Sequence, residues 1–444
     1  MATTCHPDSH TIGPIASAPI EILQHIFKSC LPDAHAPHDK PFSSTEAPLL
    51  LCRVCALWRT IAIATPQLWA RLAISVGENN NLRPSRPLIA TWVTRSASQP
   101  LSLVVHSSDQ CASAAETVDE VLQIFLPHIR RWRSITFILP CHPVPRSLAL
   151  VPDGDFLLQI AKFEFWVTTA QRPQISGLAK LLKSSPQLHT LYWGNDLEWL
   201  DIDWTRLTVL DLVPVWRPMY QVTQIMQNAP KLRSLSVYIN HAGSADVGRI
   251  VLPDLAILWI WSEVDMNPLF RRLSVPALAN INVFADFAPF IPQVEVVHCL
   301  ARCRSKLDVA IFQSLHIPEP DLIALLRTQP ALRLLELRAL TGNGMTGQLL
   351  TLLTLREASP DQNLCPDLRI IRLLQSSFSS TDGLLADMVA SRRMGVEKAS
   401  LSSLVVHFSD ADLPQHTEDI RRLRDLANEV AFRVWIHEPE TKSG

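Results

Sequence analysis

One phrase recurs along the second part of this chain and limits the folds open to it. It consists of a proline, any residue, a leucine, two residues, an aliphatic residue, one residue, and an aliphatic or aromatic residue. Two copies without the proline cover residues 207–212 and 312–317, and a weaker one covers 131–137. Clear copies begin at six prolines: Pro186, Pro230, Pro253, Pro276, Pro330 and Pro366.

The phrase predicts a short strand that follows a helix. Counting its leucine as position 1, apolar residues at positions 1, 4 and 6 fit a strand with one buried face. Helical patterns at 175–182, 222–226 and 322–326 precede three copies. The proline lies between helix and strand, where it ends the helix without removing a hydrogen bond from the sheet. Repetition at roughly 20 to 36 residues is typical of a solenoid, so we expect an α/β fold of short parallel strands and helices.

The flanking segments extend this pattern. Strands are predicted at 101–105 and 404–408, a helix at 418–430, and a last strand at 434–436. The final helix and strand would cap the last coil, because the end of a stacked array needs a covering element.

The copies resemble leucine-rich repeats in their LxxLxL core. They depart from that family at the asparagine that usually follows, since only Asn240 stands at this position. Four other copies carry Asp196, Glu263, Leu340 and Ser376 there. We therefore expect an irregular leucine-rich-repeat-like domain over 98–440 that binds a protein substrate. Trp259 alternates with the apolar positions and is the one candidate residue for that contact.

A second pattern, over 15–74, predicts two short helices with more apolar surface than they can bury. The apolar residues of the first helix cover about half its circumference, against the ~100° stripe of an ordinary core-facing helix. They are Ile22, Leu23, Ile26, Phe27, Cys30 and Leu31. The second helix is apolar almost all round, at Leu49, Leu50, Leu51, Val54, Leu57, Trp58 and Ile61. Exposed apolar area of this kind usually marks a protein-binding site.

These residues also resemble the F-box of fungal proteins. The resemblance rests on Pro19-Ile-Glu-Ile-Leu23 with Ile26-Phe27, on Val54-Cys55 and Trp58-Arg59, and on Thr65-Pro66-Gln-Leu-Trp69. It implies the substrate receptor of a Skp–cullin–F-box ubiquitin ligase, in which this module binds the Skp-type adaptor. The implied contacts are Pro19, Ile20, Leu23, Ile26, Phe27, Val54 and Trp58. Ala18 replaces the leucine that usually precedes the proline, and the insert from Pro32 to Pro48 is longer than in compact F-boxes.

Composition narrows the functional classes. The net charge of −2 and scattered basic pairs give no stripe for nucleic acid. No stretch approaches the ~20 apolar residues that cross a bilayer, and the first residues lack the pattern of a secretory signal. Nine cysteines without a disulfide framework suit a reducing compartment. We therefore expect a protein of the cytoplasm, the nucleus or both, without a nucleic-acid or membrane partner.

Two motifs carry possible chemistry. Gly342-Asn-Gly344-Met-Thr-Gly347 matches the dinucleotide fingerprint GxGxxG between a predicted strand and helix. The next acid, Asp361, precedes the following strand, whereas the fingerprint has it after that strand. Cys52-x-x-Cys55 has metal-site spacing but lacks a second ligand pair. We therefore expect no catalytic residue, metal or cofactor.

Four regions are predicted: a flexible terminus at 1–14, an F-box-like module at 15–75, a linker at 76–97 that includes a turn-rich boundary loop at 77–87, and the repeat domain at 98–440. The expected function is that of a non-catalytic ligase receptor. One alternative is a leucine-rich-repeat-like scaffold unconnected to ubiquitin, in which the helical module caps the array. The other is a dinucleotide-dependent enzyme that uses the Gly342 loop.

Overall fold

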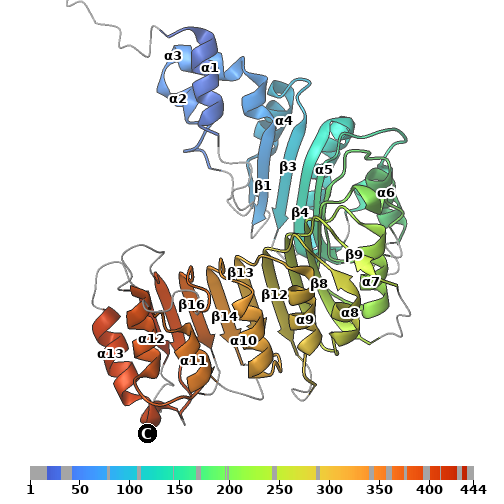
Figure 1. The fold of residues 1–444 in the computed structure, drawn as a ribbon. Coiled ribbons are helices and arrows are strands. Elements are labelled where there is room, and N and C mark those ends of the chain that lie inside the picture. Colours follow the sequence, from blue (N-terminus) through green and yellow to red (C-terminus); the bar gives the residue numbers. More distant parts are fainter. Residues whose placement is uncertain are drawn as a thin grey trace, which may run out of the picture. The chain divides into compact units, whose positions relative to one another are not determined.

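The chain is an α/β protein whose strands are mostly parallel (Figure 1). The computed structural model describes residues 18–31, 43–77, 81–107, 112–143, 145–166, 172–195, 197, 200–242, 248–286, 291–339, 345–356, 363–374, 378–393, 401–410, 412–427 and 433–437. It divides into two compact units, a first unit of Met1–Ile202 and a second unit of Asp203–Gly444. The predicted α/β class with parallel strands is thereby confirmed. The predicted repeat region 98–440 extends over both units.

The first unit combines three N-terminal helices with a six-stranded sheet. Its strands have the order β6-β5-β4-β3-β1-β2, and every neighbouring pair is parallel except β1 with β2. The strands are β1 Arg71–Gly77, β2 Asn81–Arg83, β3 Leu101–Ser107, β4 Trp132–Pro143, β5 Ile160–Trp166 and β6 Thr190–Trp193. The helices are α1 Ile20–Ser29, α2 Leu51–Val54, α3 Ala56–Ile63, α4 Arg86–Arg95, α5 Ala112–Phe125 and α6 Arg172–Lys183, with 3₁₀ helices η1 Pro66–Trp69, η3 Leu126–Arg131 and η4 Arg146–Leu150.

Two expectations for the first unit are wrong. The second predicted helix is split into α2 and α3 at Cys55, whose extended backbone (φ −158°, ψ 172°) interrupts the helical hydrogen bonds. The predicted linker at 76–97 contains the end of β1, all of β2 and all of α4. Its polar residues separate two antiparallel strands instead of two domains, since Val76 pairs with Leu82.

The second unit is a longer parallel sheet. Its strands follow the sequence in the order β7-β8-β10-β12-β13-β14-β16-β18-β19, and two short parallel pairs, β9 with β11 and β15 with β17, lie apart from it. The strands are β7 Val209–Pro218, β8 Ser234–His241, β9 Ile250–Val251, β10 Ile257–Ser262, β11 Leu273–Ser274, β12 Asn280–Ala285, β13 Val309–Gln313, β14 Leu334–Arg338, β15 Met345–Thr346, β16 Ile370–Leu374, β17 Phe378–Ser379, β18 Ser403–His407 and β19 Arg433–His437. The helices are α7 Met219–Asn228, α8 Asn267–Arg272, α9 Val294–Cys303, α10 Glu319–Arg327, α11 Gly347–Leu353, α12 Leu384–Arg393 and α13 Thr417–Ala427, with 3₁₀ helices η7 Trp204–Arg206 and η9 Leu413–Gln415.

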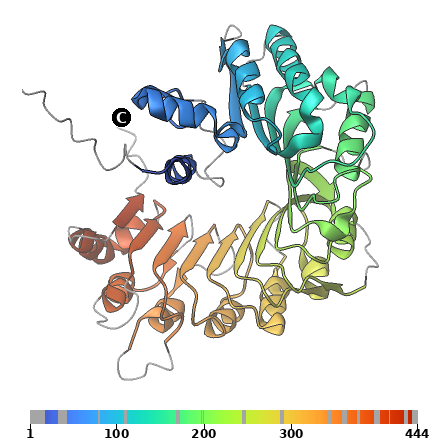
Figure 2. The ribbon, with the colours of Figure 1, turned by 90° about the horizontal axis from the view of Figure 1, so that it is seen from above.

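The recurring phrase builds the core of the second unit as continuous rows of side chains. Position 4 forms a row across eight neighbouring strands, in which every side chain is at most 1% exposed: Leu210, Leu235, Leu258, Ile281, Ala310, Leu335, Ile371 and Leu404. Position 6 forms a second buried row from Val237 to Val406. The helices of the second unit lie on one side of its sheet (Figure 2).

The prolines of the phrase occupy one structural position. In each clear copy the N–H of the leucine at position 1 donates to the carbonyl three residues earlier, as from Leu232 to Ala229 (3.3 Å) and from Leu332 to Gln329 (3.2 Å). The proline is therefore the second residue of a tight turn that joins helix to strand. Its fixed φ of about −65° suits that place, and its missing N–H is not needed there.

Most predicted strands and helices are present, and one copy is misplaced. The strand predicted at 312–317 corresponds to β13, which ends four residues earlier, at Gln313. Positions 1, 4 and 6 of this copy are therefore Leu307, Ala310 and Phe312. Leu315 and Ile317 are buried in the connection to α10. Asn240 does not begin an asparagine ladder, because its Oδ1 receives no hydrogen bond from the described residues. Asp196, Leu340 and Ser376 lie outside those residues.

Candidate functional site

The helices α1, α2 and α3, which lie together in Figure 1, expose an unusual share of the apolar surface. Seven of the fourteen large apolar side chains exposed in the described chain belong to residues 20–63, so they are strongly concentrated there. The exposed fraction reaches 54% at Ile20, 52% at Ile22 and 55% at Val54. We call these seven the apolar helical patch: Ile20, Ile22, Ile26, Leu50, Val54, Leu57 and Ile63.

The predicted adaptor contacts fall into two groups. Pro19, Ile20, Ile26 and Val54 are exposed, so a partner could touch them directly. Leu23 and Phe27 are 1% and 0% exposed, and Trp58 is half-buried. The rings of Phe27 and Trp58 lie 4.8 Å apart, so they pack α1 onto α3. These three residues therefore stabilise the helical module from within. The sequence pattern did not single out Ile63, which belongs to the apolar helical patch.

Trp69 attaches this module to the sheet of the first unit. Its side chain is fully buried, its Nε1–H donates to the Ala62 carbonyl (2.8 Å), and its ring packs edge-on against Trp92 of α4 (4.8 Å). The Arg95 guanidinium lies 4.5 Å above the same ring. A T-shaped aromatic pair and a cation above a ring are both stabilising. Trp69, part of the F-box resemblance, is therefore an internal anchor.

The second unit presents a cluster of aromatic side chains on the sheet face opposite its helices. Leu258 and Ile260 of β10 are fully buried, whereas Trp259 and Trp261 alternate with them and are half-buried. The ring of Trp261 lies 5.0 Å from Tyr238, 4.3 Å from Phe284 and 6.0 Å from Trp216. We call Trp216, Tyr238, Trp259, Trp261 and Phe284 the aromatic face.

Sequence reasoning found only Trp259 of these residues as a candidate. The missed signal is position 7 of the phrase, which is Tyr238, Trp261 and Phe284 in three successive strands. The register pairs Tyr238 with Trp261 and Trp261 with Phe284, so one row holds all three. Aromatic residues repeated at a position that faces away from the core indicate a surface with a function other than packing.

Negative charge lies beside part of the aromatic face. Burial raises the pKa of the Tyr238 phenol, and the nearby Asp211 carboxylate raises it further. The backbone bonds from Glu263 N–H to the Ile239 carbonyl (2.8 Å) and from Asp286 N–H to the Ser262 carbonyl (2.7 Å) continue the ladder beyond β10 and β12. Glu263 and Asp286 are therefore neighbours at the carboxyl ends of these strands, and both are exposed.

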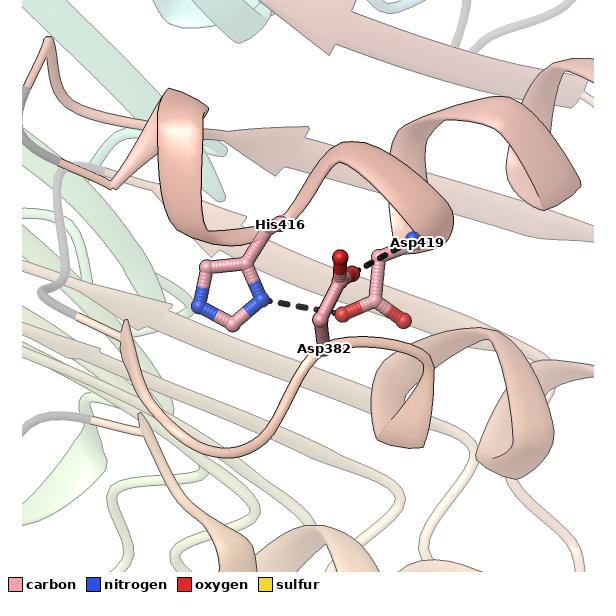
Figure 3. Close-up of side chains that lie close together, drawn as sticks. All are labelled: Asp382, His416 and Asp419. Atoms are coloured by element: carbon pink, nitrogen blue, oxygen red, sulfur yellow. Dashed lines mark hydrogen bonds and ion pairs between the residues drawn. The ribbon is translucent and has the colours of Figure 1, made fainter.

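Asp382, His416 and Asp419 lie close enough to suggest a metal site (Figure 3). Their hydrogen bonds give them another role. The Asp382 carboxylate accepts from the N–H groups of Glu418 and Asp419 (2.9 Å each), and Asp419 accepts from the Ala386 N–H (2.8 Å) and from His416 Nδ1 (2.9 Å). A carboxylate can only accept, so the hydrogen bond between His416 and Asp419 requires a proton on Nδ1, and in this arrangement that nitrogen offers no lone pair to a cation. The cluster joins the N-termini of α12 and α13.

A basic surface pocket of about 450 Å³ lies near the ends of α8 and α9. Its lining includes Arg249, Arg271, Arg272 and Arg302. Arg302 donates to the carbonyls of Phe270 (2.9 Å) and Arg271 (3.2 Å), and Arg271 pairs with Glu295. Cations near the carbonyls at a helix end are stabilising, so Arg302 of α9 supports the C-terminal end of α8.

The two chemical motifs add no assembled site within the described chain. Gly342 and Gly344 lie outside the described residues, and Gly347 begins α11. Cys55 Sγ accepts a hydrogen bond from the Trp58 N–H (3.4 Å) and so caps α3. Burial raises the pKa of the Cys52 thiol against the opposing effect of Arg95 and Arg59, which leaves less of the reactive thiolate.

Comparison with known proteins returns no match, either among family models or among curated proteins. No described helix has both the length and the apolar character needed to cross a bilayer.

Proposed function

We propose that this chain is a non-catalytic receptor that holds two proteins at once. The helices α1–α3 would be an F-box-type module that binds a Skp-type adaptor and, through it, a cullin ligase. The parallel strands with their helices would be an irregular leucine-rich-repeat-like solenoid that binds a protein substrate. Ubiquitin transfer would then be promoted by holding substrate and charged enzyme close together, since proximity alone lowers the barrier of a bimolecular step.

The apolar helical patch is the observation that carries this proposal. Each of its isoleucine, valine and leucine residues stays 37% to 55% exposed, while Leu23 and Phe27 supply buried contacts within the helical module. Burial of apolar area is worth about 25 cal/mol per Å². A partner that covers the patch would gain this free energy without unfolding the module.

Co-expression with a Skp-type adaptor tests the proposal. We expect the two proteins to co-elute on size exclusion, and the double variant Ile22→Asp with Val54→Asp to abolish co-elution. Both side chains are exposed, so this variant should fold, whereas a charge at buried Leu23 would unfold the module. Leu150→Asp is the matched control, because Leu150 is an apolar residue of the same unit and 71% exposed. Absence of co-elution, or co-elution that survives the double variant, contradicts the proposal.

A second function is favoured by the anchor at Trp69. Because this buried side chain links α3 to α4, the helical module could serve as a cap on the sheet of a scaffold unconnected to ubiquitin. Removing residues 1–64 distinguishes the two. If the module is a cap, the shortened chain should lose much of its thermal stability, and the intact protein should bind no adaptor. If the chain is a receptor, the intact protein must bind the adaptor.

A further inference from the structure

We infer that the aromatic face binds an arginine or lysine side chain from an extended segment of a protein partner. This inference rests on the proposal that the second unit binds a protein, and it names the chemistry by which that partner would be recognised. It does not depend on the identity of the partner of the apolar helical patch.

The first step is the arrangement of the rings. Tyr238, Trp261 and Phe284 stand on three neighbouring strands in one row, with Trp216 paired to Tyr238 in the register. Neighbouring strands are about 4.8 Å apart, so the row offers a run of π-systems along the sheet. The rings adopt tilted and edge-on contacts, with interplanar angles of 42° to 80°. Such a surface attracts a cation placed over a ring face, most strongly over tryptophan.

The second step is the charge at the edge of this row. Glu263 follows Trp261 by two residues and Asp286 follows Phe284 by two, so each acid extends an aromatic strand. Neither forms an ion pair with another described residue. Two carboxylates on adjacent strands repel each other, and a cation between them would remove that repulsion. Asp211 adds a third negative charge beside Tyr238.

The third step concerns hydrogen-bond acceptors near the rings. Asn282 pairs with Trp259 in the register, and Asn240 is next to Glu263 at the end of β8. The Oδ1 atoms of Asn240 and Asn282 are buried and receive no hydrogen bond from the described residues. Buried acceptors without donors are uncommon in folded proteins. Carboxylate and amide oxygens call for a ligand rich in N–H donors, which a guanidinium or ammonium group provides. The buried Trp261 Nε1–H also has no partner among the described residues and calls for one acceptor, which a backbone carbonyl of a protein partner provides.

Positive charge farther along the sheet limits how far the proposed site can extend across the strands. On the row of Trp261 and Phe284 the next residues are Gln313 and then Arg338. On the row of Trp259 the pair Glu336 with Arg372 (3.1 Å) lies beyond Ile311. A ligand cation would be repelled by Arg338, so we place it over β8, β10 and β12.

Binding of defined peptide pools to the full chain tests the inference. We would use three fluorescein-labelled pools of nine-residue peptides with random flanks and a fixed central Arg, Gln or Glu, measured by fluorescence polarisation at low salt. We expect the Arg pool to bind about tenfold more tightly than the Gln pool, because a cation over aromatic rings is attracted and two carboxylates strengthen its binding. The Glu pool should bind most weakly, and added salt should reduce the difference.

The variant Glu263→Gln with Asp286→Asn should lower the affinity for the Arg pool to about that for the Gln pool. Asp254→Asn is the matched control, because Asp254 is an exposed acid before the other end of β10 and should leave the preference unchanged. Equal affinity for the three pools, binding of none, or a preference that survives the double variant would each overturn the inference. Adaptor co-elution, measured on the same proteins, reports separately on the proposed function.

Discussion

Arg392 is a charged side chain enclosed within the second unit. It is 2% exposed, and its guanidinium donates to the carbonyls of Leu353 (2.8 Å), Leu364 (2.7 Å) and Cys365 (2.9 Å). Burial lowers the pKa of Arg392 to about 10, so the group is still charged at neutral pH. One carbonyl at the end of α11 and two in the turn before β16 therefore depend on one side chain from α12.

We predict that Arg392→Met lowers the free energy of unfolding by about 3 kcal/mol or more, because it leaves three buried acceptors without donors. Urea denaturation followed by circular dichroism measures this loss. Arg392→Lys should recover little of it, since an ammonium group cannot reproduce the planar fork of a guanidinium. Arg327→Met, at an exposed arginine in the last turn of α10, is the control. A variant as stable as this control would refute the assigned role.

Asp382 makes the stability of the second unit depend on pH in the acid range. Burial raises the pKa of its carboxyl group, but the hydrogen bonds from the Glu418 and Asp419 N–H groups and from the Thr417 hydroxyl contribute to a net lowering, so the pKa lies below its ordinary value. A carboxyl whose pKa is lower in the folded state contributes stability above its unfolded pKa of about 4. That contribution disappears as the pH falls through the folded pKa.

We therefore predict that Asp382→Asn destabilises the protein at pH 7 and flattens the decline in stability below about pH 4. Melting temperatures recorded between pH 7 and pH 3 for wild type, Asp382→Asn and the exposed-acid control Asp254→Asn provide the comparison. If wild type and Asp382→Asn lose stability in parallel as the pH falls, the carboxylate does not cap α13 in the way described.

At the scale of the strands, the two faces of one element should respond differently to the same change. Leu258→Ala removes a side chain from the buried row of position 4, and we predict a loss of about 2–5 kcal/mol in the free energy of unfolding. Ile257→Ala, at the preceding residue, removes a side chain that is 42% exposed and should cost no more than about 0.5 kcal/mol. Denaturant titration of the two variants measures both losses of free energy of unfolding. Similar losses would contradict the assigned register.

The sequence pattern predicted most of the strands in which large residues fill the buried rows. The strand β1 is an exception, because its Leu72 and Ile74 fell within the predicted F-box-like module at 15–75. Leu235, Leu258 and Ile281 are such residues, and their strands are in the predicted places. The strand β5 was missed and β13 was misplaced, and both carry alanine at position 4, Ala161 and Ala310. Alanine is small enough to be buried in the row but too weakly apolar to stand out. At β13 the buried loop residues Leu315 and Ile317 imitated the pattern.

The candidate sites were predictable to different degrees for similar reasons. The excess of apolar residues over 15–74 pointed to the apolar helical patch, because so small a module has too little interior to bury all of its isoleucines. The division between buried Leu23 and exposed Ile22 depends on how α1 packs on α3, which no single-helix pattern specifies. The aromatic face needed the register of several strands, since its residues are separated by whole helices in the sequence.

For the molecule as a whole, the two proposed binding surfaces belong to different compact units. The apolar helical patch lies in the first unit and the aromatic face in the second. Substitutions at sites that share no partners usually have additive effects. A receptor that brings two proteins together requires only that both surfaces be occupied at once.

We therefore predict that the two surfaces can be disabled one at a time. Ile22→Asp with Val54→Asp should abolish co-elution with the adaptor while the affinity for the Arg-centred peptide pool changes less than about twofold. Glu263→Gln with Asp286→Asn should remove the preference for that pool while adaptor co-elution is retained. The quadruple variant should lose both properties and still melt within a few degrees of wild type, because all four side chains are exposed. Loss of peptide binding in the patch variant would show that the surfaces are coupled, and the receptor would then act as a switch instead of a passive bridge.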